Sequence, residues 1–202
     1  MLQKKLPISF YTKDNVVGIS KELLGKYLCT HIDGRYTCGM IVETEAYSGI
    51  NDKACHAHLN RRTKRTEIMY ATGGVAYVYL CYGIHHLFNI ITNVKNKADA
   101  ILIRAIEPTD GLDVMLQRRK MDELAPKITA GPGTVSQALG INKTHYGESL
   151  FANKIWLEDR GVEINDSAII ASPRVGVAYA EEDALLPWRF RIKGNIYTSK
   201  AK

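Results

Sequence analysis

Hydrophobic and polar residues alternate along much of the chain, a pattern that predicts short β-strands joined by tight turns. The clearest example is a hairpin made of residues 27–32 and 35–47, with Asp33-Gly34 as its two-residue turn. Over about residues 15–25, apolar residues recur at helical spacing between a capping side chain and a glycine, which predicts a helix.

The middle of the chain repeats the hairpin pattern. Residues 75–81 and 85–92 form two further strands on either side of a turn at Tyr82-Gly83. A large aromatic residue therefore stands at a hairpin tip, where it has no core to enter.

One more strand and two short helices follow. Residues 99–106 form the strand, which we expect to be ended by Glu107-Pro108. Helices are predicted from about residue 109 to 121 and over residues 134–139. This mixture of hairpins and helices predicts the α+β class.

These elements together predict the organisation of the chain. We expect one compact domain over residues 1–202, with its core over about residues 10–195. Its centre would be a curved antiparallel or mixed β-sheet flanked by helices, and one β-hairpin would protrude.

Composition narrows the class of protein only slightly. Hydrophobic residues make up 46% of the 202 residues, which is enough for a core. The 27 basic and 21 acidic residues leave a net charge of +6, which suits a phosphate-bearing partner without requiring one. No apolar run has the length of a signal peptide or a membrane span, so we expect a soluble, cytoplasmic protein without a membrane partner.

The cysteines give no sign of a metal site. None of the four is at C-x-x-C spacing, and each lies among apolar or small residues, so we expect reduced, packed thiols. These residues are Cys29, Cys38, Cys55 and Cys81. His56 and His58 lack a third ligand at a convincing spacing, so neither a metal nor another cofactor is expected.

Two carboxylates are candidates for catalysis. Alternation along residues 35–47 places Glu43, Glu45 and Tyr47 on one face of a strand. A surface carboxylate is the ordinary interpretation of either glutamate. In an enclosed apolar and aromatic setting, however, Glu45 could act as a general base, with Glu43 as the competing candidate.

Aromatic and basic residues point to nucleic acid. Tyr77 and Tyr79 are either core aromatics of a strand or faces on which an extruded base stacks, whereas Tyr82 at the hairpin tip could wedge into a base stack. Basic side chains near the hairpin, and the backbone of a Gly-Pro-Gly turn before a helix, could contact phosphates. We place five residues in this group: Arg61, Arg62, Lys64, Arg65 and Gly133.

At this point several blocks of sequence resemble the alkyladenine DNA glycosylase (3-methyladenine DNA glycosylase) family. The order and spacing of the blocks agree from about residue 10 to about residue 195. The matching blocks are Ile41 to Tyr47, Asp52 and His56, Tyr77 to Asn89, Leu102 to Pro108, Gly131 to Gly133, Gln137 to Leu139, and Arg174 to Gly176.

The resemblance implies roles for the catalytic residues. Glu45 matches the glutamate that activates the attacking water, and Arg104 matches an arginine near that water and the phosphate of the flipped nucleotide. Tyr82 matches the tyrosine that fills the gap left in the duplex. Lys143 matches a lysine that contacts the DNA backbone.

The resemblance also implies a pocket for the flipped base. Tyr47 matches an aromatic on one side of the base, and His56 and Tyr79 match residues on the other side. Tyr77 matches a pocket wall. Asn89 matches an asparagine that disfavours the 2-amino group of guanine.

The activity implied is a monofunctional DNA repair glycosylase, acting as a monomer on double-stranded DNA. It would release 3-methyladenine, 7-methylguanine, hypoxanthine or ethenoadenine and leave an abasic site. Two alternatives remain open from the residues. One is a non-catalytic binder of damaged nucleic acid, and the other is an unrelated hydrolase or nucleoside-processing enzyme with Glu43 and Glu45 as paired carboxylates.

Overall fold

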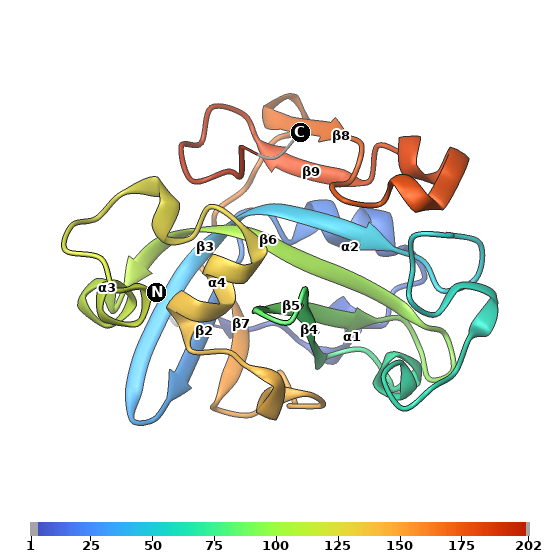
Figure 1. Cartoon of the computed structure of the whole chain (residues 1–202), viewed down its shortest axis with the longest axis horizontal. Helices are drawn as coiled ribbons and strands as arrows, with labels where there is room; N and C mark the ends of the chain where they lie inside the picture. Colours follow the sequence, from blue (N-terminus) through green and yellow to red (C-terminus); the bar gives the residue numbers. More distant parts are fainter. Residues whose placement is uncertain (1–3, 201–202) are drawn as a thin grey trace.

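A curved antiparallel sheet forms the centre of the computed structural model, which describes residues 4–200. Its two longest strands, β3 and β6, run side by side along the molecule (Figure 1). The strands are β1 (Lys4–Lys5), β2 (Tyr27–Ile32), β3 (Arg35–Tyr47), β4 (Val75–Cys81), β5 (His85–Thr92), β6 (Asp99–Asp110), β7 (Ile155–Asp159), β8 (Ile169–Ser172) and β9 (Arg189–Ile192).

The order of strands across the sheet is β1-β7-β2-β3-β6-β5-β4. The β8–β9 pair joins at β3, where β9 pairs with the segment that contains both candidate carboxylates. Every strand pairing described for residues 4–200 is antiparallel, which settles the choice left open between an antiparallel and a mixed sheet.

Helices cover both faces of this sheet. The helix α4 packs against β5 and β6, and α2 lies behind β3 (Figure 1). The α-helices are α1 (Ile8–Tyr11), α2 (Val16–Glu22), α3 (Leu112–Arg119) and α4 (Pro132–Leu139). The 3₁₀ helices are η1 (His58–Asn60), η2 (Glu67–Tyr70), η3 (Pro126–Ile128), η4 (Lys143–His145), η5 (Asp166–Ala168) and η6 (Ala178–Leu185). The predicted α+β class is confirmed.

Local sequence explains the elements that were predicted well. The Asn15 side chain accepts a hydrogen bond from Gly18 N at 2.8 Å, so it caps the first turn of α2. Asp33 and Gly34 both have positive φ, as a two-residue hairpin turn between twisted strands requires. The predicted hairpins β2–β3 and β4–β5 are confirmed with the same strand bounds.

The predicted end of the strand at Glu107-Pro108 is wrong, because β6 continues to Asp110. β5 pairs with β6 only as far as Leu102, so Pro108 lies on a stretch that no longer borders β5. On the other side the β3–β6 register shifts between Cys38 and Gly39, next to the position paired with Pro108. At such an irregular edge the missing N–H of proline removes no regular ladder bond.

The expectation of four reduced thiols is also wrong. Cys29 and Cys38 are disulfide-bonded across the β2–β3 hairpin, whereas Cys55 and Cys81 are free. The two bonded residues are direct partners in the ladder, with their Cα atoms 4.2 Å apart. The turn at residues 33–34 fixes that register, so the predicted hairpin already implies that Cys29 and Cys38 lie opposite each other.

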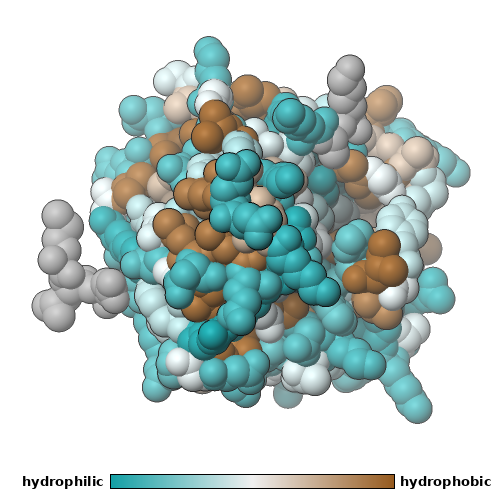
Figure 2. Space-filling view, turned by 60° about the vertical axis from the view of Figure 1, so that its left-hand side comes forward, coloured by the Kyte–Doolittle hydropathy of each residue, from teal (hydrophilic) through white to brown (hydrophobic). Residues whose placement is uncertain are grey.

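The hydrophobic core lies between the sheet and its helices, and a smaller cluster lies beside it. The smaller cluster includes Cys55, Tyr70, Tyr77 and Ile91, so it packs the turn after β3 against the β4–β5 hairpin. On the side that carries α3, exposed hydrophobic side chains form small areas separated by hydrophilic ones (Figure 2). Within residues 4–200, no helix combines the length and apolar character that a membrane crossing needs.

Candidate active site

A cavity of about 580 Å³ opens where the β4–β5 hairpin meets β3 and β6. This volume is in the range of roughly 300–1,000 Å³ that is usual for ligand pockets. Ten of the predicted site residues line it: Glu45, Tyr47, His56, Arg65, Tyr77, Tyr79, Tyr82, Asn89, Arg104 and Gly133. Four of the predicted DNA-backbone residues do not: Arg61, Arg62, Lys64 and Lys143.

Glu45 lines the cavity although its side chain is fully buried. Three donors hold the carboxylate. The Tyr47 hydroxyl donates to Oε2 at 2.7 Å, the Val175 backbone N–H donates to Oε1 at 2.8 Å, and Arg104 Nη1 lies 3.2 Å from Oε1. Hydrogen bonds and a nearby positive charge favour the ionised form that a general base needs.

Glu43 occupies a different environment two residues earlier on β3. Its Oε1 accepts from Arg104 Nε at 2.9 Å, from Arg189 Nε at 2.7 Å and from the Ser199 hydroxyl at 2.8 Å, and its Oε2 accepts from the Ser199 backbone N–H. Glu43 is fully buried and does not line the cavity. Its lone pairs are engaged within the protein, which leaves Glu45 as the carboxylate that can reach a ligand.

Arg104 connects these two carboxylates. Burial alone would lower its pKa, but the carboxylates of Glu45 and Glu43 raise it above its ordinary value. The guanidinium is therefore permanently charged. It lies at the cavity wall, between the buried cluster around Glu43 and the candidate base.

Tyr47 stays protonated in this setting. Burial and then the Glu45 carboxylate raise its pKa well above the ordinary value of 10.0, so its hydroxyl remains a donor to Glu45. The guanidinium of Arg174 lies 4.8 Å from the centre of the Tyr47 ring. Tyr47 is thus fixed by a hydrogen bond at its hydroxyl and by a cation–π contact on its ring.

The opposite wall carries a hydrogen-bonded group made of His56, Tyr77 and Arg65. Burial, together with the Arg65 guanidinium, lowers the pKa of His56 to about 4, so the imidazole is neutral near pH 7. Arg65 Nη2 lies 3.2 Å from His56 Nε2 and can only donate, so the imidazole hydrogen is on Nδ1, 2.8 Å from the Tyr77 hydroxyl oxygen. Burial raises the pKa of Tyr77 to about 12.

Aromatic surfaces complete this wall. The rings of His56 and Tyr79 meet edge to face with their centres 4.8 Å apart, and the Arg65 guanidinium lies 4.8 Å from the centre of the Tyr79 ring. The Asn89 amide nitrogen donates to the carbonyls of Tyr77 at 3.1 Å and of Leu87 at 3.4 Å. Both amide hydrogens of Asn89 are therefore used, which fixes the orientation of its side chain.

Tyr82 stands at the tip of the β4–β5 hairpin with 87% of its surface exposed. It adopts φ 51°, and Gly83 adopts φ 73°, while the Ile84 N–H donates to the Cys81 carbonyl at 3.2 Å. Positive φ is unusual for a bulky side chain, so the turn holds the aromatic ring outward at some conformational cost.

The predicted DNA-backbone residues occupy several places. Arg65 contacts the cavity wall, and Arg61 and Arg65 line an adjoining cavity of about 590 Å³. Arg62 pairs with Glu67 at 2.6 Å on the surface. Gly133 faces His85, because a Cβ at Gly133 would lie 2.8 Å from the His85 ring. Lys64 and Lys143 are exposed, and all these backbone contacts stay predictions.

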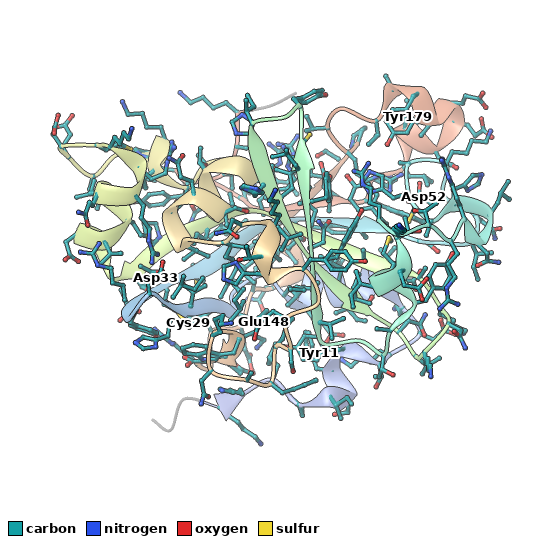
Figure 3. The ribbon with its side chains drawn as sticks, turned by 60° about the horizontal axis from the view of Figure 1, so that its bottom comes forward. Tyr11, Cys29, Asp33, Asp52, Glu148 and Tyr179 are labelled. Atoms are coloured by element: carbon teal, nitrogen blue, oxygen red, sulfur yellow. A yellow bond between two sulfur atoms is a disulfide. The ribbon has the colours of Figure 1, made fainter. Side chains whose placement is uncertain are left out.

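Two further groups support the site, and neither was predicted to do so. Asp52 and Arg174 form a buried ion pair. Figure 3 shows Asp52 near Tyr179, on the side of the molecule away from Cys29. Ser199 holds Glu43 from the C-terminal segment. Asp52 and Arg174 had been noted only as parts of separate matching blocks, because their contact spans 122 residues.

Residues 4–200 contain no group of three or more histidine, cysteine, aspartate or glutamate side chains placed to hold a metal ion. What the cavity offers is a buried carboxylate, a permanently charged arginine and aromatic walls. This arrangement can enclose a planar heterocycle and bring a water molecule to a carboxylate.

Comparison with known proteins points to one family. Residues 9–196 match the model of the methylpurine-DNA glycosylase family. A protein of Chlamydia felis is 47% identical over 197 residues, which are 96% of this chain and 98% of that protein. Proteins of Natranaerobius thermophilus and Clostridium perfringens are 40% and 41% identical, over 96% and 97% of this chain and 98% and 99% of their own lengths. All three carry 3-methyladenine DNA glycosylase as a provisional name.

Proposed function

Because the chain belongs to the methylpurine-DNA glycosylase family, and is therefore a DNA glycosylase of DNA repair, we propose that it excises damaged purines by a base-flipping, single-step hydrolysis. Glu45 would activate the attacking water. The observation that carries this proposal is the position of Glu45, a carboxylate held by three donors at the wall of an aromatic cavity. As the relatives are bacterial proteins, the enzyme would act on the chromosome in the cytoplasm.

Binding begins with the hairpin tip. Tyr82 enters the duplex and takes the space of the nucleotide that rotates out, since its exposed ring is held outward by the turn. Unstacking and unpairing cost roughly a few kcal/mol, and less for a damaged base that pairs poorly. Basic residues near the hairpin contact the phosphates on either side. A monomer suffices for these contacts.

The cavity then accepts the base. Tyr47 on one side and His56 and Tyr79 on the other offer ring faces, which favour electron-poor purines such as alkylated adenine or guanine. Asn89 cannot turn aside, because both of its amide hydrogens are bound to backbone carbonyls. It therefore excludes the 2-amino group of a normal guanine by contact.

The hydrolysis uses one water and no covalent intermediate. The water oxygen attacks the anomeric carbon, its proton passes to the Glu45 carboxylate, and the electron pair of the breaking bond leaves with the base. A cationic alkylpurine leaves directly as a neutral base, whereas hypoxanthine or ethenoadenine takes up a proton from solvent. Arg104 holds the water and the nearby phosphate by its fixed positive charge.

The chemistry proposed here stops at the abasic site. Cleavage of the DNA strand by a bifunctional glycosylase needs an amine that forms a Schiff base with the sugar. No lysine lines the cavity in the described part of the chain. We therefore assign a monofunctional activity.

The test is base release from duplex oligonucleotides, each with one 3-methyladenine analogue, 7-methylguanine, hypoxanthine or ethenoadenine, without added metal. An undamaged duplex is the control, and strand breaks are scored before and after alkali. We expect release from at least one lesion duplex, with breaks only after alkali. Tight lesion binding without release would instead identify a non-catalytic damage binder, and release only from free nucleosides would identify a nucleoside hydrolase.

A further inference from the structure

The buried ion pair behind the cavity connects three parts of the chain. Arg174 Nη1 and Nη2 contact the two carboxylate oxygens of Asp52 at 2.5 and 2.8 Å, and neither side chain is exposed. Nη1 also donates to the Ala46 carbonyl at 2.8 Å, and Nη2 donates to the Asp183 carbonyl at 3.0 Å. One guanidinium thus ties β3 to the turn after it and to η6.

The same guanidinium controls two of the three donors to Glu45. Arg174 precedes Val175, whose N–H donates to Glu45 Oε1 at 2.8 Å. The guanidinium also lies 4.8 Å from the ring centre of Tyr47, whose hydroxyl donates to Glu45 Oε2 at 2.7 Å. Its bond to the Ala46 carbonyl fixes the backbone of β3 between Glu45 and Tyr47.

We propose that Arg174, held by Asp52, is a positioning residue for the catalytic step. It sets the Val175 N–H and the Tyr47 hydroxyl on the Glu45 carboxylate, so that the carboxylate faces the site of the attacking water. The inference rests on the proposed function, because it assumes that Glu45 is the base. Arg174 itself is not among the residues that line the cavity, so it acts through the groups that touch Glu45.

The contacts of Arg174 require the planar, forked guanidinium of an arginine. Its two terminal nitrogens serve the Asp52 carboxylate and two backbone carbonyls at once. A lysine ammonium keeps the charge and can pair with Asp52, but a single nitrogen cannot reach all these acceptors. Arg174→Lys should therefore keep the fold and the buried charge pair while it loosens Val175 and Tyr47.

The experiment measures single-turnover excision of hypoxanthine and, separately, the dissociation constant for the same duplex. We expect Arg174→Lys to lower the excision rate about 10- to 100-fold, as displacement of a catalytic group by about an ångström does, and to weaken lesion binding far less than it lowers the rate. The matched control is Arg160→Lys, which alters a half-buried arginine paired with Glu158 and Asp110 away from the cavity. This control should excise at the wild-type rate.

A second measurement separates positioning from general damage to the fold. In a Glu45→Gln background, with the more labile 7-methylguanine as substrate, adding Arg174→Lys should change the rate by less than about twofold, because no base is left to position. An equal loss in both backgrounds, or a loss of lesion binding that parallels the loss of excision, would overturn the proposal.

These measurements distinguish a failure of the proposed function from a failure of the positioning role. Wild-type excision by Glu45→Gln would remove Glu45 as the base and with it the mechanism proposed above. Loss of excision in Glu45→Gln together with wild-type excision in Arg174→Lys would remove only the positioning role of Arg174.

Discussion

Glu43 and Glu45 are two residues apart on one strand, yet they belong to regions of opposite character. The Glu43 region is closed, because two arginines and Ser199 engage its carboxylate inside the protein. The Glu45 region is open to a ligand, because its carboxylate lines the cavity beside aromatic rings. Arg104 contacts both carboxylates and is the boundary between the two regions.

The surroundings of a carboxylate, and not its place on a strand, therefore decide its use. A carboxylate with all its acceptors engaged stabilises the fold and has nothing to offer a substrate. A carboxylate held by a few donors at a cavity wall keeps both its charge and access to a water. Substitutions in the closed region should therefore change stability, and substitutions around the cavity should change activity.

The largest effect on stability is expected from Glu43→Gln. The change leaves Arg104 and Arg189 buried around a neutral group, and breaking such a buried pair costs about 3–5 kcal/mol of unfolding free energy. Urea unfolding followed by circular dichroism measures this loss. An unfolding free energy within about 0.5 kcal/mol of wild type would show that the closed region is not structural.

Tyr82→Ser should have the opposite effect, with a loss of activity and almost no loss of stability. The side chain is 87% exposed, so its loss should change the unfolding free energy by less than about 0.5 kcal/mol. Excision of hypoxanthine should fall about 10- to 100-fold, because nothing fills the gap that the flipped nucleotide leaves, a cost of a few kcal/mol. Single-turnover kinetics give the rate, and an unchanged rate would exclude the wedge role.

His56→Gln should affect both regions' properties, because His56 lines the cavity and also changes stability in acid. Its pKa falls from 6.5 to about 4 on folding, so the unfolded chain binds a proton first as the pH drops. The stability that the neutral His56 contributes is complete above about pH 6.5 and is lost as the pH falls to about 4. The variant should lose about 2 kcal/mol less than wild type between pH 7 and pH 5 in urea unfolding. Identical pH dependence would contradict a neutral, half-buried imidazole.

Asn89→Ala should give the smallest effect. Removal of the fixed amide opens room for a 2-amino group, so release of undamaged guanine should rise by roughly tenfold, the value of one removed steric contact in a pocket. Excision of hypoxanthine should change far less. Quantification of free guanine after long incubation with undamaged duplex is the measurement, and no increase would remove this account of discrimination.

Local rules predicted the hairpins well, because their signals lie within a few residues. The Asp33-Gly34 turn and the alternation on either side of it determine both strands and their register. The same register places Cys29 opposite Cys38, a consequence that composition alone did not indicate. The strand end at Pro108 was mispredicted because it depends on where the neighbouring strand β5 stops pairing.

Predictions for the candidate site also succeeded for individual residues and failed for contacts between distant parts of the chain. Ten of the predicted site residues line the cavity, and they were found from the residue pattern or through the family resemblance. The groups that hold them were not, since Asp52 and Arg174 are 122 residues apart and Glu43 and Ser199 are 156 apart. Their contacts depend on the folded sheet and its C-terminal segment, and no local pattern records them.

The most direct test of the account is single-turnover excision of hypoxanthine by Glu45→Gln and Glu43→Gln beside wild type, at a temperature where all three are folded. We predict that Glu45→Gln loses about 10²- to 10⁴-fold in rate, the usual contribution of a general base, and still binds the lesion duplex. The excision rate of Glu43→Gln should stay within about tenfold of wild type, because Glu43 affects the reaction only through its contact with Arg104. Excision by Glu45→Gln at the wild-type rate, or a greater loss in Glu43→Gln, would contradict the assignment of Glu45 as the base.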